Sequence, residues 1–347
     1  MIGQSRGISG GLSRLSPLQL RPATVTLALL VVLAALAALA AVSGDFPIPL
    51  ADLGKVLTGT ANELTTTVVL EWRLPRIAAA IVVGAALGVA GGLFQTVTRN
   101  PLASPDVMGL SNGAFVGMLV ALVVAGSSIE SRTIGALAGG LVTALVIFAL
   151  SRGLGFGGFR FIVVGVAISS MAAALGTWLL LQVDVDTALF ASAWGAGTLA
   201  GVTVAGVASA AALVAVLVAL VPAHVRALHQ LGLGDDVAIV TGVRVAATRV
   251  TMLLVGVFLV CVATTVAGPV AFVALAAPQI AKRLVGTAHI PLLTTALFGS
   301  VMLSASDLIA QHALPVTVPV GVVTVVIGGC YLVWFLVREA RANRRAG

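Results

Sequence analysis

The stretch ATVTLALLVVLAALAALAAV, residues Ala23 to Val42, contains no charged side chain. A helix needs about 20 apolar residues to cross the hydrocarbon core of a bilayer, so this run is long enough to span it. Similar runs recur along the chain, which is 59% hydrophobic and 9% charged, whereas soluble domains carry about 25% charged residues. The runs are continuous and do not alternate as barrel strands do. The sequence therefore predicts an all-α, polytopic integral membrane protein.

Ten spanning helices are expected, and the boundaries between them come from polar or helix-breaking residues. Glu130-Ser131-Arg132 divides one long apolar stretch, and Gly268-Pro269 divides another. The expected spans are 23–43, 75–96, 109–126, 132–150, 161–181, 203–221, 250–267, 270–285, 292–310 and 320–337.

Three parts of the chain are expected in sequence order. A mobile N-terminal tail (1–22) precedes the transmembrane domain (23–338), and a short C-terminal tail (339–347) follows it. The first apolar run could instead belong to a cleaved signal peptide, but its length and the many later spans favour a retained helix.

The distribution of basic residues predicts the orientation. With ten spans and both termini in the cytoplasm, four of the 19 Lys and Arg residues fall outside, namely Lys55, Arg73, Arg76 and Arg132. The other fifteen fall inside, as the positive-inside rule requires. This rule also explains the net charge of +7, so a nucleic-acid partner is not needed to account for it. An eight-span arrangement with both ends inside satisfies the same rule and stays open.

Glycine recurs every four residues on the second expected span, at Gly84, Gly88 and Gly92. This spacing places three side chains without a Cβ on one helix face, where another backbone can approach closely. Two roles are compatible with it: helix packing within the subunit, or the lining of a wide conduit.

The chain lacks the residues that several kinds of transport and catalytic chemistry require. Asp307 is the one acid expected clearly within a span, whereas transporters driven by ion gradients usually carry several. The four histidines have no metal-ligand spacing, and Cys261 and Cys330 lie in apolar runs, typical of small core residues. Neither lysine stands in a Gly-Lys-Ser/Thr phosphate loop. We therefore expect no catalytic residue, no metal site and no cofactor in this chain, and ATP hydrolysis in a separate protein.

Four stretches combine into a specific pattern. They are WRLPR (72–76), the segment GxxLGxxGGLFQxxxRNPLASPDxxGxSxGA from Gly84, the polar stretch HQLGLGDDVAIVTGVRVAATR (229–249), and AGPVAFVALAAPQIAKRLVG (267–286) followed by LPVTVPVGVVT. In this order they resemble the FecCD family of ABC-importer permeases, which import ferric siderophores, haem and cobalamin. The resemblance covers about Trp72 to Arg338. It implies ten helices, a second permease subunit, identical or unlike, two cytoplasmic ATPases that use ATP, an external substrate-binding protein, and a place in the cytoplasmic membrane.

The resemblance assigns docking of the binding protein to the arginines of the RLPR element, here Arg73 and Arg76. Anchoring of the span in the lipid headgroups is the alternative role for them. The family places a further arginine in an ADLxAR-like element, where this chain has SDLIAQ. Gln311 therefore stands at the third docking position. Asn100 and Pro101, after the glycine-rich span, are grouped with Gly84, Gly88 and Gly92 as candidates for helix packing or conduit lining.

Two departures from the family pattern bear on the cargo. The family commonly has FVGL and PHxxR, whereas this chain has Ala274, Gln279 and Lys282-Arg283. Such variants resemble the permeases for catecholate, enterobactin-like siderophores, in which two unlike permeases pair. Permeases for cobalamin or haem are the alternative within the family, and a proton-driven transporter or a membrane enzyme lies outside it.

The polar stretch matches the family's cytoplasmic loop, predicted over 223–249, in which two short helices dock on the ATPase. Gly232 and Gly234 permit tight turns, and Asp235 and Asp236 suit a helix N-terminus. Gly242 is expected to end this helix, and a second short helix is expected to begin near Val245. A solvated loop with one stray helix is the alternative. The expected coupling residues are Leu231, Gly232, Leu233, Gly234, Asp235, Asp236, Val237, Val240, Thr241, Gly242 and Arg244.

Overall fold

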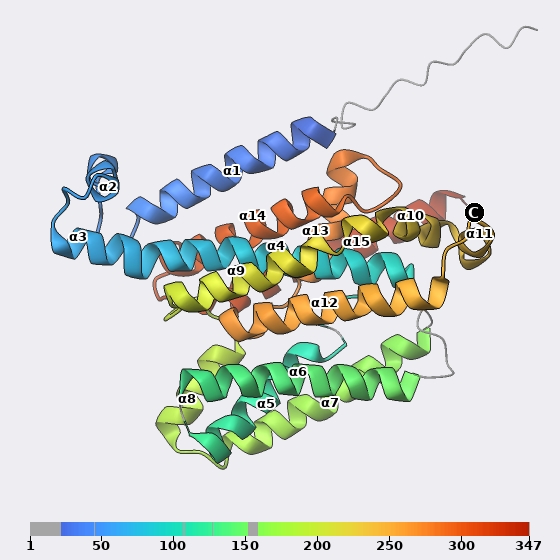
Figure 1. The fold of residues 1–347 in the computed structure, drawn as a ribbon, viewed down its shortest axis with the longest axis horizontal. Helices are drawn as coiled ribbons and strands as arrows, with labels where there is room; N and C mark the ends of the chain where they lie inside the picture. Colours follow the sequence, from blue (N-terminus) through green and yellow to red (C-terminus); the bar gives the residue numbers. More distant parts are fainter. Residues whose placement is uncertain (1–21, 45, 107, 127, 152–158, 347) are drawn as a thin grey trace, which may run out of the picture.

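The computed structural model describes residues 22–44, 46–106, 108–126, 128–151 and 159–346. The N-terminal tail expected over 1–22 therefore lies, apart from Pro22, outside the described residues, as does Arg152. Within the described residues every regular element is a helix, which confirms the all-α expectation (Figure 1).

The helices follow one another with short connections. The long ones are α1 (Pro22–Val42), α4 (Leu74–Thr98), α5 (Leu110–Ala125), α6 (Ile129–Ser151), α7 (Phe159–Leu180), α9 (Val204–Ala219), α12 (Val245–Ala267), α14 (Leu292–His312) and α15 (Val320–Ala346). The shorter ones are α2 (Leu50–Leu57), α3 (Glu63–Thr67), the π-helix η1 (Val68–Arg73), α8 (Val185–Gly195), the 3-10 turn η2 (Pro222–His224), α10 (Val225–Leu233), α11 (Asp235–Val240) and α13 (Val273–Val285).

Each of the ten expected spans coincides with a helix. In the described part of the chain, eight helices are long and apolar enough to cross a membrane, and α5 is a shorter apolar helix. The helix α13 has 13 residues and falls below that length. The protein is thus a multi-pass membrane protein, while the count of ten spans and the cytoplasmic position of both ends stay predictions.

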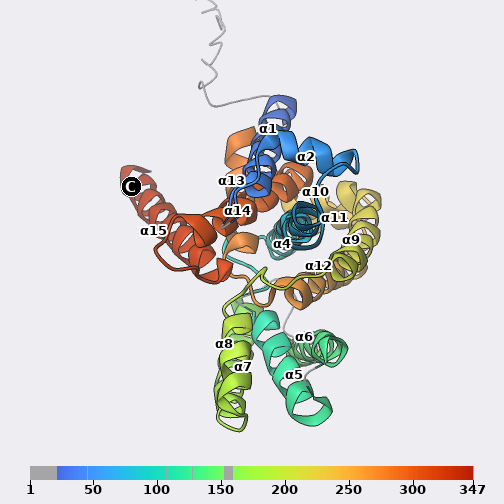
Figure 2. The same cartoon turned by 90° about the vertical axis from the view of Figure 1, so that its left-hand side faces the viewer.

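Helix α4 lies at the centre of the larger layer of helices. It runs nearly the full length of the molecule between α14, α13, α9 and α12 (Figures 1 and 2). Through α3 and η1 it continues backward to Glu63, so the second span begins about three turns before the expected residue 75. Of its most apolar window, 72% is buried, against 17% for α1. Helix α4 is therefore the core of the fold.

A second group of helices, α5 to α8, projects from one side of this layer (Figure 2). Helices α5 and α6 pack backbone to backbone, because a Cβ at Gly117 would overlap the carbonyl oxygen of Gly135. The spacing that places Gly113 beside Gly117 and Gly135 beside Gly139 is the same four-residue spacing as in α4. It could have predicted this contact from the sequence.

Some boundaries differ from the sequence prediction for local reasons. The break between α5 and α6 falls at Gly126, whose φ is +83°, so Glu130-Ser131-Arg132 lies in the first turn of α6. The break at Gly268-Pro269 is confirmed, because α12 ends at Ala267. Helix α8 was not expected, although Asp184 caps it by accepting from Thr187 N at 2.9 Å. Helix α15 continues to Ala346, so the tail expected from 339 is helical there.

Candidate coupling and docking sites

The polar stretch folds into two short helices, α10 and α11, at one end of the molecule (Figure 1). Gly234 separates them with φ +125° and ψ 158°, a conformation that favours glycine. Gly232, expected in a turn, lies instead within α10. The prediction of a second short helix near Val245 is wrong, because Val245 begins the long helix α12. The pair of short helices therefore lies earlier, over residues 225–240.

Helix α11 ends before Gly242, as expected, and its end is a Schellman motif. Gly242 has φ +84°, and its N–H donates to Ile239 O at 2.9 Å. The N–H of Val243 donates to Ala238 O at 2.9 Å. These bonds satisfy carbonyls that would otherwise lack a partner at the helix end.

Asp235 connects α11 to two of the long helices. Its carboxylate lies 3.0 Å from Arg99, which follows α4, and 2.6 Å from Arg249 on α12. Arg99 adopts φ +51°, an uncommon conformation for a residue other than glycine. The first turn of α11 contains both Asp235 and Asp236, as predicted. The two neighbours differ, however, because within the described residues Asp235 forms two ion pairs and Asp236 forms none.

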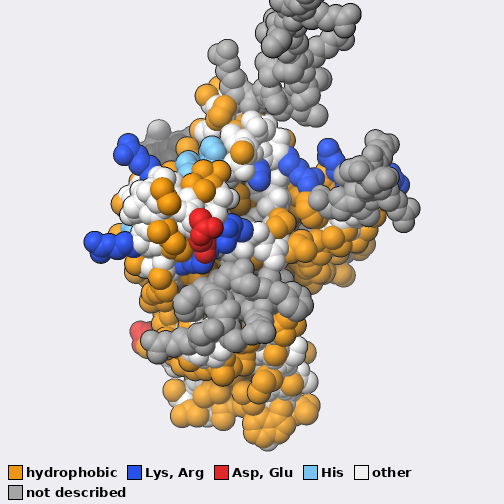
Figure 3. Space-filling model, turned by 90° about the vertical axis from the view of Figure 1, so that its right-hand side faces the viewer, with side chains coloured by type: hydrophobic (Ala, Val, Ile, Leu, Met, Phe, Trp, Pro, Cys, Tyr) orange, Lys and Arg blue, Asp and Glu red, His pale blue; other side chains and the backbone are white. Residues whose placement is uncertain are grey.

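Four apolar side chains project from α10 and α11, and we call them the coupling patch: Leu233, Val237, Ile239 and Val240. Val240 is 88% exposed and Leu233 is 73% exposed. This end of the molecule also gathers Lys and Arg side chains (Figure 3), which under the positive-inside rule favours a cytoplasmic face. Exposed apolar side chains at an aqueous face are typical of a site for a protein partner.

The remaining coupling candidates have other positions. Leu231 is buried, with 1% of its surface exposed, and fixes α10 against the body. The Thr241 hydroxyl donates to Val237 O at 2.8 Å. Arg244 is exposed beside the start of α12. Ile239 was absent from the predicted set, although its spacing from Val240 and Val237 in one short helix could have included it.

Two histidines meet beside this end. The rings of His229 on α10 and His289, before α14, lie 4.2 Å apart between centroids. Burial, followed by the charges of His229 and Lys282, lowers the pKa of His289 below its usual value. In the described residues no group of three His, Cys, Asp or Glu side chains is arranged to hold a metal ion.

At the opposite end of α4, the three predicted docking residues line one cavity of about 230 Å³. Arg76 makes a two-pronged ion pair with Asp307 of α14, with Nε to Oδ2 at 3.0 Å and Nη2 to Oδ1 at 2.9 Å. Gln311 donates to the same carboxylate at 2.7 Å. Asp307 is only 5% exposed, so Arg76 compensates a carboxylate that would otherwise be costly to bury.

Arg73 serves a different structural role in the same cavity. Its guanidinium donates to the carbonyl oxygens of Ala41, at 2.6 Å, and of Phe46. These carbonyls belong to the end of α1 and the segment after it. A Cβ at Gly44 would lie 2.7 Å from the Arg73 Nη2 atom. Arg73 thus ties the first span to the start of α4.

The glycine face of α4 packs against a neighbouring helix of the same chain. A Cβ at Gly84 would lie 2.5 Å from Gly299 O, and one at Gly88 would lie 2.6 Å from Thr295 O, both on α14. At Gly92 the nearest atom is Leu292 Cδ2 at 2.8 Å. In this conformation the three glycines therefore take part in helix packing.

Asn100 and Pro101 shape the turn after α4. The Asn100 side-chain oxygen accepts from Leu102 N at 2.9 Å, while Pro101 is exposed. Near the C-terminal end of α4, the buried Gln95 donates to Leu275 O at 3.0 Å and accepts from the Gln279 side chain at 2.7 Å. Gln279, one of the departures noted above, thereby joins α13 to the centre of the fold.

The bundle of apolar helices defines a multi-pass membrane protein. It has an exposed apolar patch on two short helices at one end and a charged cavity at the other. The chain belongs to the FecCD transport family, whose model matches residues 29–338. This assignment makes the chain a translocation subunit rather than an enzyme.

Curated relatives support the assignment over most of their length. The ferric enterobactin transport system permease protein FepG of Escherichia coli K12 is 43% identical over 300 residues, 86% of this chain and 91% of the relative. The Fe(3+) dicitrate permease protein FecD of the same organism is 36% identical, over 78% of this chain and 85% of the relative. The hemin permease protein HmuU of Yersinia pestis is 32% identical, over 81% and 86%.

A solved structure has the same fold. A metal-chelate type ABC transporter in an inward-facing conformation superposes with a TM-score of 0.78, covering 91% of this chain and 99% of that one, at 22% identity.

Proposed function

We propose that this chain is a permease subunit of a binding-protein-dependent ABC importer that carries a ferric catecholate siderophore across the cytoplasmic membrane. The observation that carries the proposal is the 43% identity with the ferric enterobactin permease FepG over 86% of this chain. The relatives named for iron dicitrate and hemin are 36% and 32% identical. These lower values favour the catecholate cargo over haem.

An unlike second permease is the proposed partner within the membrane. Escherichia coli has a second protein named as a ferric enterobactin permease, FepD, and this chain is 35% identical to it. Two different chains of one organism are therefore both named as ferric enterobactin permeases. The higher identity with FepG, 43% against 35% with FepD, supports a FepG-like role for this chain beside a FepD-like partner.

The coupling patch is the proposed contact with a cytoplasmic ATPase. Leu233, Val237, Ile239 and Val240 form a short apolar surface, which an apolar groove on a partner accepts. Asp235 holds this surface to Arg99 and Arg249. A displacement of α11 by the ATPase is thereby transmitted to α4 and α12, the two most buried long helices.

The charged cavity at the other end of α4 is the proposed docking region for an external binding protein. Arg73 and Arg76 are partly exposed there and already hold α1 and α14. A carboxylate from the binding protein would compete with Asp307 for Arg76. Docking would therefore act on the contact between α4 and α14, and α4 connects this contact to the coupling patch.

Uptake in a bacterial strain that lacks this chain tests the proposal. Restoring the chain should restore uptake of radiolabelled iron supplied as a ferric catecholate, and leave uptake of ferric hydroxamate, ferric citrate and haem unchanged. Haem uptake without catecholate uptake would overturn the cargo. Uptake that persists with an ATPase unable to hydrolyse ATP, but stops when the proton gradient collapses, would overturn the ABC mechanism.

A further inference from the structure

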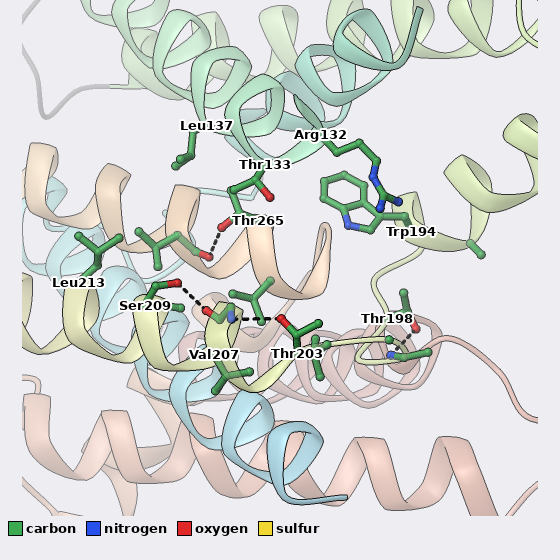
Figure 4. Close-up of a pocket in the computed structure, with 18 of the residues that line it drawn as sticks. Arg132, Thr133, Leu137, Trp194, Thr198, Thr203, Val207, Ser209, Leu213 and Thr265 are labelled. Carbon is green, nitrogen blue, oxygen red and sulfur yellow. Dashed lines mark hydrogen bonds between the residues drawn. The ribbon is translucent and has the colours of Figure 1, made fainter. Parts of the chain in front are cut away.

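A cavity between helices lies apart from both the coupling patch and the docking residues. It has a volume of about 400 Å³ and is enclosed by α6, α8, α9 and α12 (Figure 4). Neither the coupling patch nor the docking residues contribute to its lining. Its volume falls within the range of roughly 300 to 1,000 Å³ that is common for small-molecule sites.

The two ends of this cavity differ in chemistry. Arg132 and Trp194 lie close together at one end, and Leu213 lies at the other (Figure 4). Arg132 stands in the first turn of α6, and Thr203 caps the start of α9. Leu213 is ten residues beyond Thr203, a distance of about 15 Å along the helix. The cavity is thus an elongated space with a cation at one end and a mainly apolar lining, to which the hydroxyl side chains of Ser209 and Thr265 also contribute.

Arg132 is placed to receive an anion. Its guanidinium carbon lies 4.6 Å from the centre of the Phe190 ring, and its Nε donates to Ser128 O at 3.3 Å. Within the described residues Arg132 forms no ion pair, whereas Arg76, Arg99 and Arg249 each have a carboxylate partner. Tryptophan side chains such as Trp194 are typical of the headgroup level of a membrane.

The walls of the cavity continue into surfaces that face the bilayer. Helices α6 and α9 are each 22% buried over their most apolar windows. Exposed apolar side chains, such as Ile134 on α6 and Val216 on α9, flank the cavity. Lipid around these exposed apolar faces would allow an acyl chain to enter the cavity from the side.

We propose that this cavity is a binding site for an anionic glycerophospholipid. The headgroup phosphate pairs with Arg132 beside Trp194, and one acyl chain lies along α9 toward Leu213. Basic side chains in pockets between transmembrane helices are known to bind anionic lipid headgroups. The lipid would hold the α5–α8 group against α9 and α12. The proposal does not depend on the identity of the cargo.

Native mass spectrometry of the purified full-length chain in mild detergent tests the site. Phosphatidylglycerol and phosphatidylcholine with identical acyl chains are titrated separately. The unmodified chain should bind phosphatidylglycerol about fivefold more tightly, as expected for one cationic contact near the surface. Arg132→Gln should remove this preference, and Arg132→Lys should retain it. An equal preference in the Arg132→Gln variant would overturn the proposal.

A matched pair of variants on α9 separates this cavity from the general lipid shell. Leu213→Trp fills the apolar end and should weaken binding of both lipids, whereas Val216→Trp, outside the lining, should weaken neither. Both side chains are more than half exposed, at 51% and 63%, so neither change disturbs the core. Unchanged binding in Leu213→Trp would contradict the site. Displacement of the lipid by a ferric catecholate would instead assign the cavity to cargo and overturn the proposal.

Discussion

The carboxylate of Asp307 on α14 accepts hydrogen bonds from two nitrogens of Arg76 on α4, within a cavity at one end of the bundle. Asp307 is the acid that the sequence places within a span, and its pairing gives it a structural role. The pair spans 231 positions of sequence. It locks the start of the central helix to a helix that also packs against the glycine face of α4.

Breaking this pair should destabilise the protein. We expect Asp307→Ala to lower the free energy of unfolding by about 2–3 kcal/mol, because Arg76 would be left partly buried without its partner. A double-mutant cycle with Arg76→Ala should give a coupling energy of about 1–3 kcal/mol. Unfolding of the detergent-solubilised chain in increasing denaturant measures both values.

The ion pair between Lys55 and Asp52 on α2 provides the control. It has a distance of 2.7 Å, but its side chains are 58% and 34% exposed. Solvent screening should reduce its coupling energy to below about 0.5 kcal/mol. A coupling energy for Arg76 and Asp307 no larger than this would contradict a structural role for their pair.

The other end of α4 has a related arrangement, because Asp235 holds Arg99 and Arg249 together. Asp235→Asn should loosen α11 and reduce capture of the ATPase by up to about fivefold, since a partly exposed ion pair contributes up to about 1 kcal/mol. Asp236→Asn removes the same charge one residue away and should have a smaller effect. Co-purification of the ATPase with each variant measures the difference, and equal losses would count against the role assigned to Asp235.

The coupling patch makes its own prediction. Val240→Asp places a charge at the most exposed apolar position of α11 and should abolish ATPase capture, because a carboxylate would enter an apolar groove. Leu64→Asp, on α3 at the opposite end, changes a side chain that is also exposed, at 55%. It should leave capture intact. Both variants should reach the membrane in normal amounts, and retained capture in Val240→Asp would remove this surface from the interface.

Features governed by neighbours in sequence were predictable. The stop at Gly242 and the acidic first turn of α11 depend on residues within one helical turn of each other. The apolar runs likewise predicted a helix for every expected span. By contrast, the start of α12 at Val245 was missed, because Val245 to Arg249 mixes polar and apolar residues as a surface helix also does.

Contacts between residues far apart in the chain could not be predicted from the sequence. The resemblance to the family brought Arg73, Arg76 and Gln311 into one set, and the structure places all three in one cavity. Their intrachain partners could not be inferred, because Asp307, Ala41 and Phe46 show no local pattern that points to an arginine. The same holds for Gln95 and Gln279, which are 184 positions apart.

Two glycines in the coupling region should respond in opposite ways to the same substitution. Gly242 and Gly232 both have room for a Cβ atom, so an alanine at either position would not overlap with neighbouring atoms. Gly242 has φ +84°, and an alanine there costs about 1–2 kcal/mol. Gly232 lies within α10, where an alanine should stabilise the helix by up to about 1 kcal/mol. Hydrogen exchange of the purified chain should therefore quicken across 235–243 in Gly242→Ala and slow across 225–233 in Gly232→Ala. Slower exchange in both variants would show that α11 does not need the left-handed stop in order to fold.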